Sequence, residues 1–208
     1  DMNNIQKCES DFKAFAEEIE EELLHGKVSI SNEGEVQFTS SKAKSKKLPI
    51  HLTASIVKTL SSLVFYLKHL ARSNDLIIID EPELNLHPDN QIVLTRIFAR
   101  LINAGFRLLV STHSDYIVRE LNNLIMLSSQ NGGVVELRKK FRYRESEQIK
   151  SDEVSAYYFD FKTKTTVGVK QLIVNECGFE VPSIDNTIDN QNNVTEELFY
   201  ALKYSEQE

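Results

Sequence analysis

Two short aliphatic runs, separated by one helical segment, constrain the fold of this chain most. LIIID at 76–80 and FRLLVS at 106–111 each have the length of a strand, and the segment from Pro88 to Gly105 carries apolar residues at helical spacing. A strand, a helix and a second strand in this order form a βαβ unit with parallel strands. The carboxyl ends of both strands therefore meet at one edge, where open α/β sheets bind ligands.

Polar residues follow both strands directly. Asp80 and Glu81 end the first run, and His113 lies in STHS at the end of the second. An Asp in this position can hold the Mg²⁺ that bridges nucleotide phosphates, and a neighbouring Glu can orient or deprotonate a water. His113 can donate a hydrogen bond to a phosphate. Each residue alone also has a structural explanation, so the prediction rests on their meeting at one rim.

A zinc site built from His113, His87 and the acids is the competing interpretation of this cluster. No pair among these residues has the close helical spacing of a metal-binding motif. The spacing therefore favours a nucleotide site.

Apolar periodicity predicts the elements around the βαβ unit. Before it we expect a helix over 5–24 ended by Gly26, a β-hairpin over 27–39, a Lys/Ser loop, and a helix over 53–71 that begins near a Thr or Ser cap. After it we expect a helix capped by Ser114 or Asp115, a helix over 134–142, a hairpin formed by VSAYYFDF and TTVGV, and helical turns at 170–177 and 195–204.

Composition limits the classes of protein. The net charge of −7 argues against a surface that grips nucleic acid everywhere, and no apolar run reaches the roughly 18 residues of a membrane span. Two lone cysteines and the absence of a secretory pattern favour a reducing cytoplasm. SKAKSKK at 41–47 is typical of a solvated loop, whereas RKKFRYR at 138–144 could stack on and neutralise a phosphate strand.

The segment LTASIVKTLSSL at 52–63 begins a predicted helix with Thr53 and Ser55. Free amides, hydroxyls and the positive end of the helix dipole can bind an anion there. Taken alone, this segment is better explained by an ordinary helix cap.

The run from LPIHLTASIV through LIIIDEPELNLHP to FRLLVSTHSDYIVRELNNLIML, residues 48–127, resembles the C-terminal half of ABC-type AAA-family ATPases. These are the prokaryotic group related to overcoming-lysogenisation-defect and SMC-like ATPases, and the tail of the chain is similar to the end of the same proteins. The resemblance implies an α/β fold: the C-terminal lobe of an ABC-type P-loop ATPase, with a mostly parallel sheet flanked by helices and small β-hairpin and helical additions. It divides the chain into 1–47, 48–130 and 131–208.

The resemblance also implies roles for single residues. Asp80 would be the Walker B metal residue, Glu81 the catalytic base and His113 the switch histidine. Asn85 lies in the D-loop segment LNLH, at the seam of a homodimer that sandwiches ATP and Mg²⁺; the other residues expected to contact nucleotide are Ser55, Ser111 and Thr112. Ser55 stands for the signature serine, although Ala54 and Ile56 flank it where the pattern carries glycines.

The seven glycines include no G-x-x-x-x-G-K-[ST] phosphate loop. We therefore expect a Walker A lobe upstream in the same protein or in another chain, and no ATP turnover by these residues alone. A non-hydrolysing dimerisation scaffold is one alternative. A metal-dependent nuclease is less favoured, since Asp185 and Asp189 are spaced D-x-x-x-D. Relatives act in phage defence, toxin-linked systems and DNA transactions, so the resemblance implies an effector protein or nucleic acid as further partners and no membrane.

Overall fold

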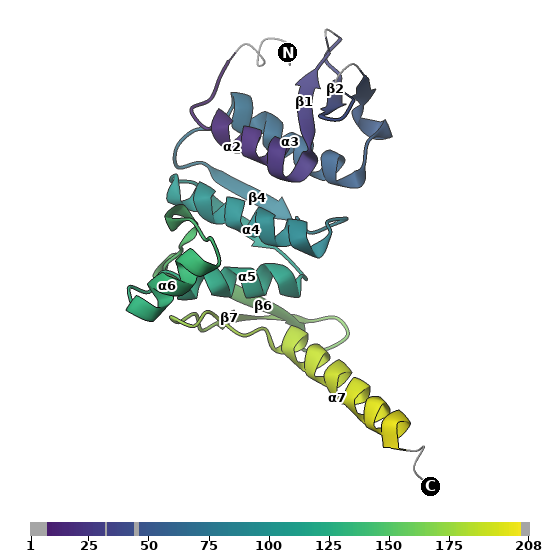
Figure 1. Ribbon diagram of the computed structural model, residues 1–208, viewed down its shortest axis with the longest axis vertical. Coiled ribbons are helices and arrows are strands. Elements are labelled where there is room, and N and C mark those ends of the chain that lie inside the picture. Colours follow the sequence, from purple (N-terminus) through teal and green to yellow (C-terminus); the bar gives the residue numbers. More distant parts are fainter. Residues whose placement is uncertain (1–7, 32, 44–45, 205–208) are drawn as a thin grey trace. The chain divides into compact units, whose positions relative to one another are not determined.

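The computed structural model describes residues 8–31, 33–43 and 46–204. The chain divides into two compact units, Asp1–Ile149 and Lys150–Glu208. Figure 1 labels their elements. The α/β class predicted from the sequence is confirmed.

The first unit begins with α2 (Lys13–Ile19), which continues as the single π-helical turn η1 (Glu20–Leu24). The predicted helix over 5–24 is thus confirmed over 13–24 and wrong over 8–12, which form no helix, and residues 5–7 lie outside the described residues. Its expected end at Gly26 is wrong, because His25 takes the left-handed conformation with φ 49°. Gly26 instead begins a strand, where an added Cβ would lie 2.4 Å from a ring carbon of Phe38.

Strands β1 (Gly26–Ile30) and β2 (Val36–Ser40) form the predicted hairpin. A third antiparallel strand, β3 (Lys47–Pro49), pairs with β2 where only a Lys/Ser loop was expected. After the turn η2 (Ile50–Leu52), the predicted second helix is present as α3 (Ser55–His69). Its expected Thr or Ser cap is wrong: Ala54 holds the N-cap position without a side-chain hydrogen bond, and the Thr53 hydroxyl donates to the Ile50 carbonyl at 2.5 Å.

The predicted βαβ unit is confirmed. Its elements are β4 (Leu76–Asp80), α4 (Pro88–Asn103) and β5 (Arg107–Ser111), followed by α5 (Asp115–Met126). The two strands pair in parallel, with Asp80 opposite Ser111. Ser114 caps α5 by accepting the Ile117 N–H at 3.3 Å, and Gly105 follows α4 with φ 97°. Among the described strands, this is the parallel pair; the other two sheets are antiparallel.

The two faces of the β4–β5 sheet have different surroundings. Residues of the inner face pack against the core that α3 and α4 build, and Figure 1 shows α4 running alongside β4. The inner-face residues are Ile77, Ile79, Leu108 and Val110. The outer face is open, with Leu76, Ile78 and Leu109 51%, 67% and 57% exposed. The aliphatic runs predicted strands buried on both faces, but only the inner face is covered by described residues.

The first unit ends with α6 (Gly132–Lys140) and the turn η3 (Glu145–Glu147). The predicted helix over 134–142 is therefore confirmed, two residues earlier than expected. Asn131 caps α6 by accepting the Gly133 N–H at 2.9 Å.

The second unit contains η4 (Ser151–Glu153), the predicted hairpin β6 (Ala156–Phe161) and β7 (Val167–Leu172), and α7 (Pro182–Tyr204). The predicted helical turns at 170–177 are wrong, because Lys170 to Leu172 pair with β6. The helix expected at 195–204 is the end of the longer α7, none of whose residues is buried. Within the described part of the chain, no helix has both the length and the apolar character needed to cross a bilayer.

Candidate functional site

The carboxyl ends of β4 and β5 lie side by side and are joined by hydrogen bonds. The Ser111 hydroxyl donates to Asp80 Oδ1 and accepts the Glu81 N–H at 3.2 Å. The same N–H also donates to the Ser111 carbonyl at 3.1 Å. Asp80 is thereby held at the rim with its carboxylate exposed to solvent.

Glu81 has an unusual backbone conformation. Its φ of 43° lies in the left-handed region, which costs a residue with a side chain roughly 1–2 kcal/mol. The next residue, Pro82, is fully buried and so anchors the chain immediately after the turn. Strain of this kind persists where the surroundings over-determine it and collects at functional sites. Here it presents the Glu81 carboxylate at the rim.

His113 lies on the same side of the sheet edge as the acids. Its Nε2 atom is 3.5 Å from Glu81 Oε1, and the His113 side chain is 87% exposed. The meeting of Asp80, Glu81 and His113 that the strand order predicted is therefore present. An exposed imidazole at this distance is free to turn toward a ligand bound over the rim.

Glu83 is a rim residue that the sequence reasoning missed. Its Oε1 atom accepts the Thr112 hydroxyl at 2.9 Å and the His113 N–H at 2.7 Å. The signal available in the sequence is a second glutamate in DEPE, two residues after Glu81. The Thr112 hydroxyl also accepts the Ser114 N–H at 3.0 Å, so this predicted nucleotide contact already has two partners within the chain.

The predicted D-loop segment forms a turn that points two residues outward. Asn85 is exposed with φ 64°, a conformation that asparagine tolerates, and Leu84 is 52% exposed. Leu86 is buried in the core and fixes the end of the turn. Leu84 and Asn85 are therefore accessible to another molecule.

Ser55 is the exposed first residue of α3. No hydrogen bond or ion pair recorded for the described residues joins Ser55 to Asp80, Glu81 or His113. Because Ser55 is exposed, it is accessible to another molecule.

A comparison with protein families matches the model described as "AAA ATPase domain" over residues 2–118, more than half of the chain. The chain belongs to this family. It is also similar to a chain from the solved structure described as "Structural biochemistry of ATP-driven dimerization and DNA stimulated activation of SMC ATPases", with 13% identity and a TM-score of 0.43 over 88% of this chain and 90% of that one. A likeness at that level carries no functional argument. A comparison with curated proteins finds no match.

Side chains that can bind metal are not clustered in the described part of this AAA ATPase domain. The described residues contain no group of three or more His, Cys, Asp or Glu that could hold a metal ion, so the zinc interpretation gains no support. Mg²⁺ in nucleotide sites is commonly held by one or two carboxylates together with water and phosphate oxygens. The exposed Asp80 carboxylate, with the Ser111 hydroxyl beside it, fits that donor set.

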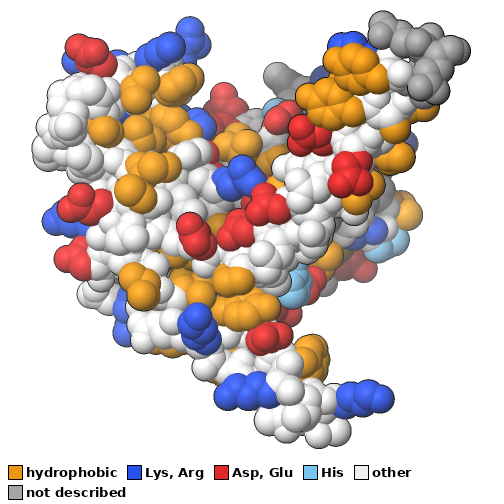
Figure 2. All heavy atoms as spheres, turned by 90° about the horizontal axis from the view of Figure 1, so that it is seen from below, with side chains coloured by type: hydrophobic (Ala, Val, Ile, Leu, Met, Phe, Trp, Pro, Cys, Tyr) orange, Lys and Arg blue, Asp and Glu red, His pale blue; other side chains and the backbone are white. Residues whose placement is uncertain are grey.

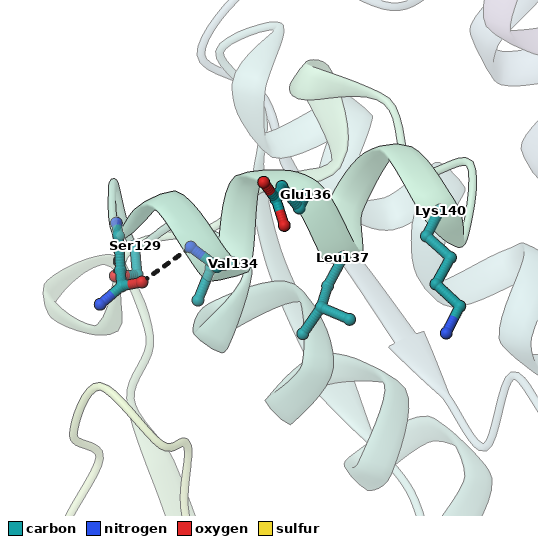
Figure 3. A pocket seen from close by; sticks show the side chains of 7 residues that line it. Ser129, Val134, Glu136, Leu137 and Lys140 are labelled. Carbon is teal, nitrogen blue, oxygen red and sulfur yellow. Dashed lines mark hydrogen bonds between the residues drawn. The ribbon is translucent and has the colours of Figure 1, made fainter.

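The rim is an open edge, and a hollow in the first unit lies elsewhere. The hollow, of about 790 Å³, runs along α6. Figure 3 shows that the Leu137 and Lys140 side chains, which line it, extend from the same side of that helix. Its other lining residues are Ser129, Asn131, Gly133, Val134 and Glu136. No predicted nucleotide-site residue lines it, so the hollow is separate from the candidate site.

Part of the basic segment RKKFRYR makes contacts within the first unit. Arg138 is buried and donates to the Leu127 carbonyl at 2.6 Å, and Arg144 pairs with Glu18 at 2.9 Å. Tyr143 lies under the Arg96 guanidinium, 4.1 Å from carbon to ring centroid. These contacts account for three of the seven residues and reduce the segment's capacity to bind a phosphate strand.

Proposed function

We propose that this AAA ATPase domain supplies the metal carboxylate, the catalytic base and the switch histidine of an ATP-hydrolysing site. The observation that carries the proposal is the meeting of Asp80, Glu81 and His113 at the carboxyl edge of β4–β5. Asp80 would hold Mg²⁺ on the phosphates. Mg²⁺ would supply charge neutralisation as the terminal phosphate leaves.

Glu81 would orient the attacking water and accept its proton, and His113 would donate a hydrogen bond to the γ-phosphate. The 3.5 Å between His113 Nε2 and Glu81 Oε1 supports this division of roles, because both side chains can face one phosphate. General base catalysis of this kind contributes about 10²–10⁴-fold to a rate.

A phosphate loop must come from outside the printed sequence, in the same protein or in another chain. The outer face of β4–β5 supports this part of the proposal. Leu76, Ile78 and Leu109 are all more than half exposed there, and a further layer of structure would bury them. The Walker A lobe is the occupant we propose for this face.

A second subunit would complete the site in a nucleotide-bridged homodimer. The exposed Leu84 and Asn85 would lie at the seam, and Ser55 would contact the nucleotide of the partner from the start of α3. Ala54 and Ile56 favour one alternative, a dimer that binds ATP without hydrolysing it, since they replace the glycines of the usual signature.

The test is ATP turnover by the protein together with the lobe that carries the phosphate loop. Glu81→Gln is expected to retain ATP binding, to lower turnover by about 10²–10⁴-fold and to accumulate nucleotide-bound dimers, because the base is lost while the phosphate contacts stay. Glu136→Gln, on an exposed position of α6, is the matched control. Wild-type dimerisation without phosphate release would favour the alternative, and unchanged turnover in Glu81→Gln would place the base elsewhere.

A further inference from the structure

Glu83 links the loop after β4 to the loop after β5. Three consecutive residues at the end of β5 contact three residues at the end of β4. Ser111 bonds Asp80, His113 lies against Glu81, and Thr112 and His113 both donate to Glu83 Oε1. The first of these contacts continues the sheet. The contacts of Glu83 are the ones that hold the backbone of His113 itself.

The carboxylate of Glu83 is only half satisfied. Its Oε2 atom is buried without a hydrogen-bond partner among the described residues, whereas Oε1 accepts both donors. A buried acceptor without a partner costs about 1–3 kcal/mol. The two hydrogen bonds to Oε1 are therefore the contacts by which Glu83 acts on the histidine loop.

We propose that Glu83 is a positioning residue that fixes His113 relative to Glu81 for the hydrolysis proposed above. The hydrogen bond from the His113 N–H to Glu83 Oε1, at 2.7 Å, fixes the backbone from which the imidazole extends. The imidazole Nε2 atom then lies 3.5 Å from Glu81 Oε1. Because Glu83 directly precedes the exposed Leu84 and Asn85, the same side chain couples that turn to the histidine loop.

Two substitutions of Glu83 distinguish the effect of its acceptor oxygen from the effect of its negative charge. Glu83→Gln keeps a side-chain oxygen that can accept from Thr112 and from the His113 N–H, whereas Glu83→Ala removes both bonds. Misplacing a catalytic group by about 1 Å can cost on the order of 10²-fold in rate. The alanine variant is therefore expected to lower kcat by about 10–100-fold with little change in the KM for ATP, and the glutamine variant to keep most of the wild-type kcat.

The experiment measures steady-state ATP hydrolysis by the protein with its phosphate-loop lobe, for wild type, Glu83→Ala, Glu83→Gln and Glu153→Ala. Glu153 is the matched control, since its carboxylate also accepts a backbone N–H, that of Lys150 at 2.9 Å, within the second unit. Hydrogen exchange of the His113 amide, followed by NMR on the 208-residue chain, gives a readout independent of turnover. Faster exchange in Glu83→Ala, reversed in Glu83→Gln, is expected.

The outcomes distinguish this inference from the function on which it rests. If Glu81→Gln abolishes turnover while Glu83→Ala keeps the wild-type kcat, Glu83 does not position His113 and the proposed function survives. If Glu81→Gln leaves turnover unchanged, the proposed function fails first. Equal loss of kcat in the alanine and glutamine variants would overturn the role of the acceptor oxygen, as would unchanged exchange of the His113 amide in Glu83→Ala.

Discussion

Charged side chains gather at two places in the first unit, with opposite surroundings. At the rim, Asp80 and His113 are exposed and Glu81 is strained. Between the N-terminal helix, α4, α5 and η3 lies a second group, the buried ion-pair network, in which most charges are paired. Its members are Glu18, Glu22, Arg96, Arg100, Glu120, Tyr143, Arg144 and Glu147.

The buried ion-pair network joins distant parts of the chain. Arg100, 4% exposed, donates to Glu18 at 3.1 Å, and Arg96 donates to Glu120 at 2.6 Å. Burial raises the pKa of the Glu147 carboxyl above its ordinary value, which marks the cost of removing charge from water here. The network therefore depends on each partner staying in place.

The different surroundings of the rim and of the buried ion-pair network indicate different roles for their charges. At the centre of the network, Arg100, Glu120 and Glu147 are buried among protein partners, so losing one partner leaves another charge buried and less well paired. Charges at the rim face solvent, where they are available to a ligand. Apolar side chains show the same contrast, since several large ones lie open to solvent outside the core, in orange in Figure 2. Stability and chemistry should therefore respond to different substitutions.

The largest effect is expected from breaking the network at its most buried member. Arg100→Ala should lower the free energy of unfolding by about 1.5–3 kcal/mol, because its buried guanidinium donates to Glu18 and lies 4.0 Å from Glu147, while both carboxylates keep Arg144 nearby. Urea unfolding followed by circular dichroism measures this. Lys139→Ala, on an exposed position of α6, serves as the control. A loss similar to that of the control would mean that the network contributes little to stability.

A change of opposite sign is expected at the rim. Glu81→Gly should raise the free energy of unfolding by about 1 kcal/mol, because relief of the left-handed strain of roughly 1–2 kcal/mol exceeds the added chain entropy of about 0.4–1 kcal/mol. The same variant should lose ATP turnover. Glu81→Ala removes the carboxylate but keeps the strain, so it should not be stabilised; equal stability of the two variants would show that the strain is not released by glycine.

Local patterns in the sequence were sufficient for most elements of the first unit. Apolar periodicity located α3, β4, α4 and β5, and the order of strands brought Asp80 next to Ser111. These features depend on residues that are close in sequence and on the rule that parallel strands of one sheet end at the same edge.

What the sequence did not reveal depends on contacts between distant residues. The pairing of Arg144 with Glu18 and the burial of Arg138 turned a basic stretch, which could have bound nucleic acid, into structural side chains. The strand β3 is too short to show an alternation of apolar and polar residues, so its pairing with β2 is what defines it. Glu83 was missed because its carboxylate accepts hydrogen bonds from a loop that begins 29 residues further along the chain, and no local pattern predicts such a contact.

The measurement that tests the central claim most directly is a double-mutant cycle of ATP turnover. It compares Glu81→Gln, His113→Ala and the double variant in the protein with its phosphate-loop lobe, under single-turnover conditions. If both side chains act as a unit on one phosphate, the double variant should lose no more activity than the more damaging single variant. Losses that multiply, or a histidine variant with wild-type turnover, would contradict the account.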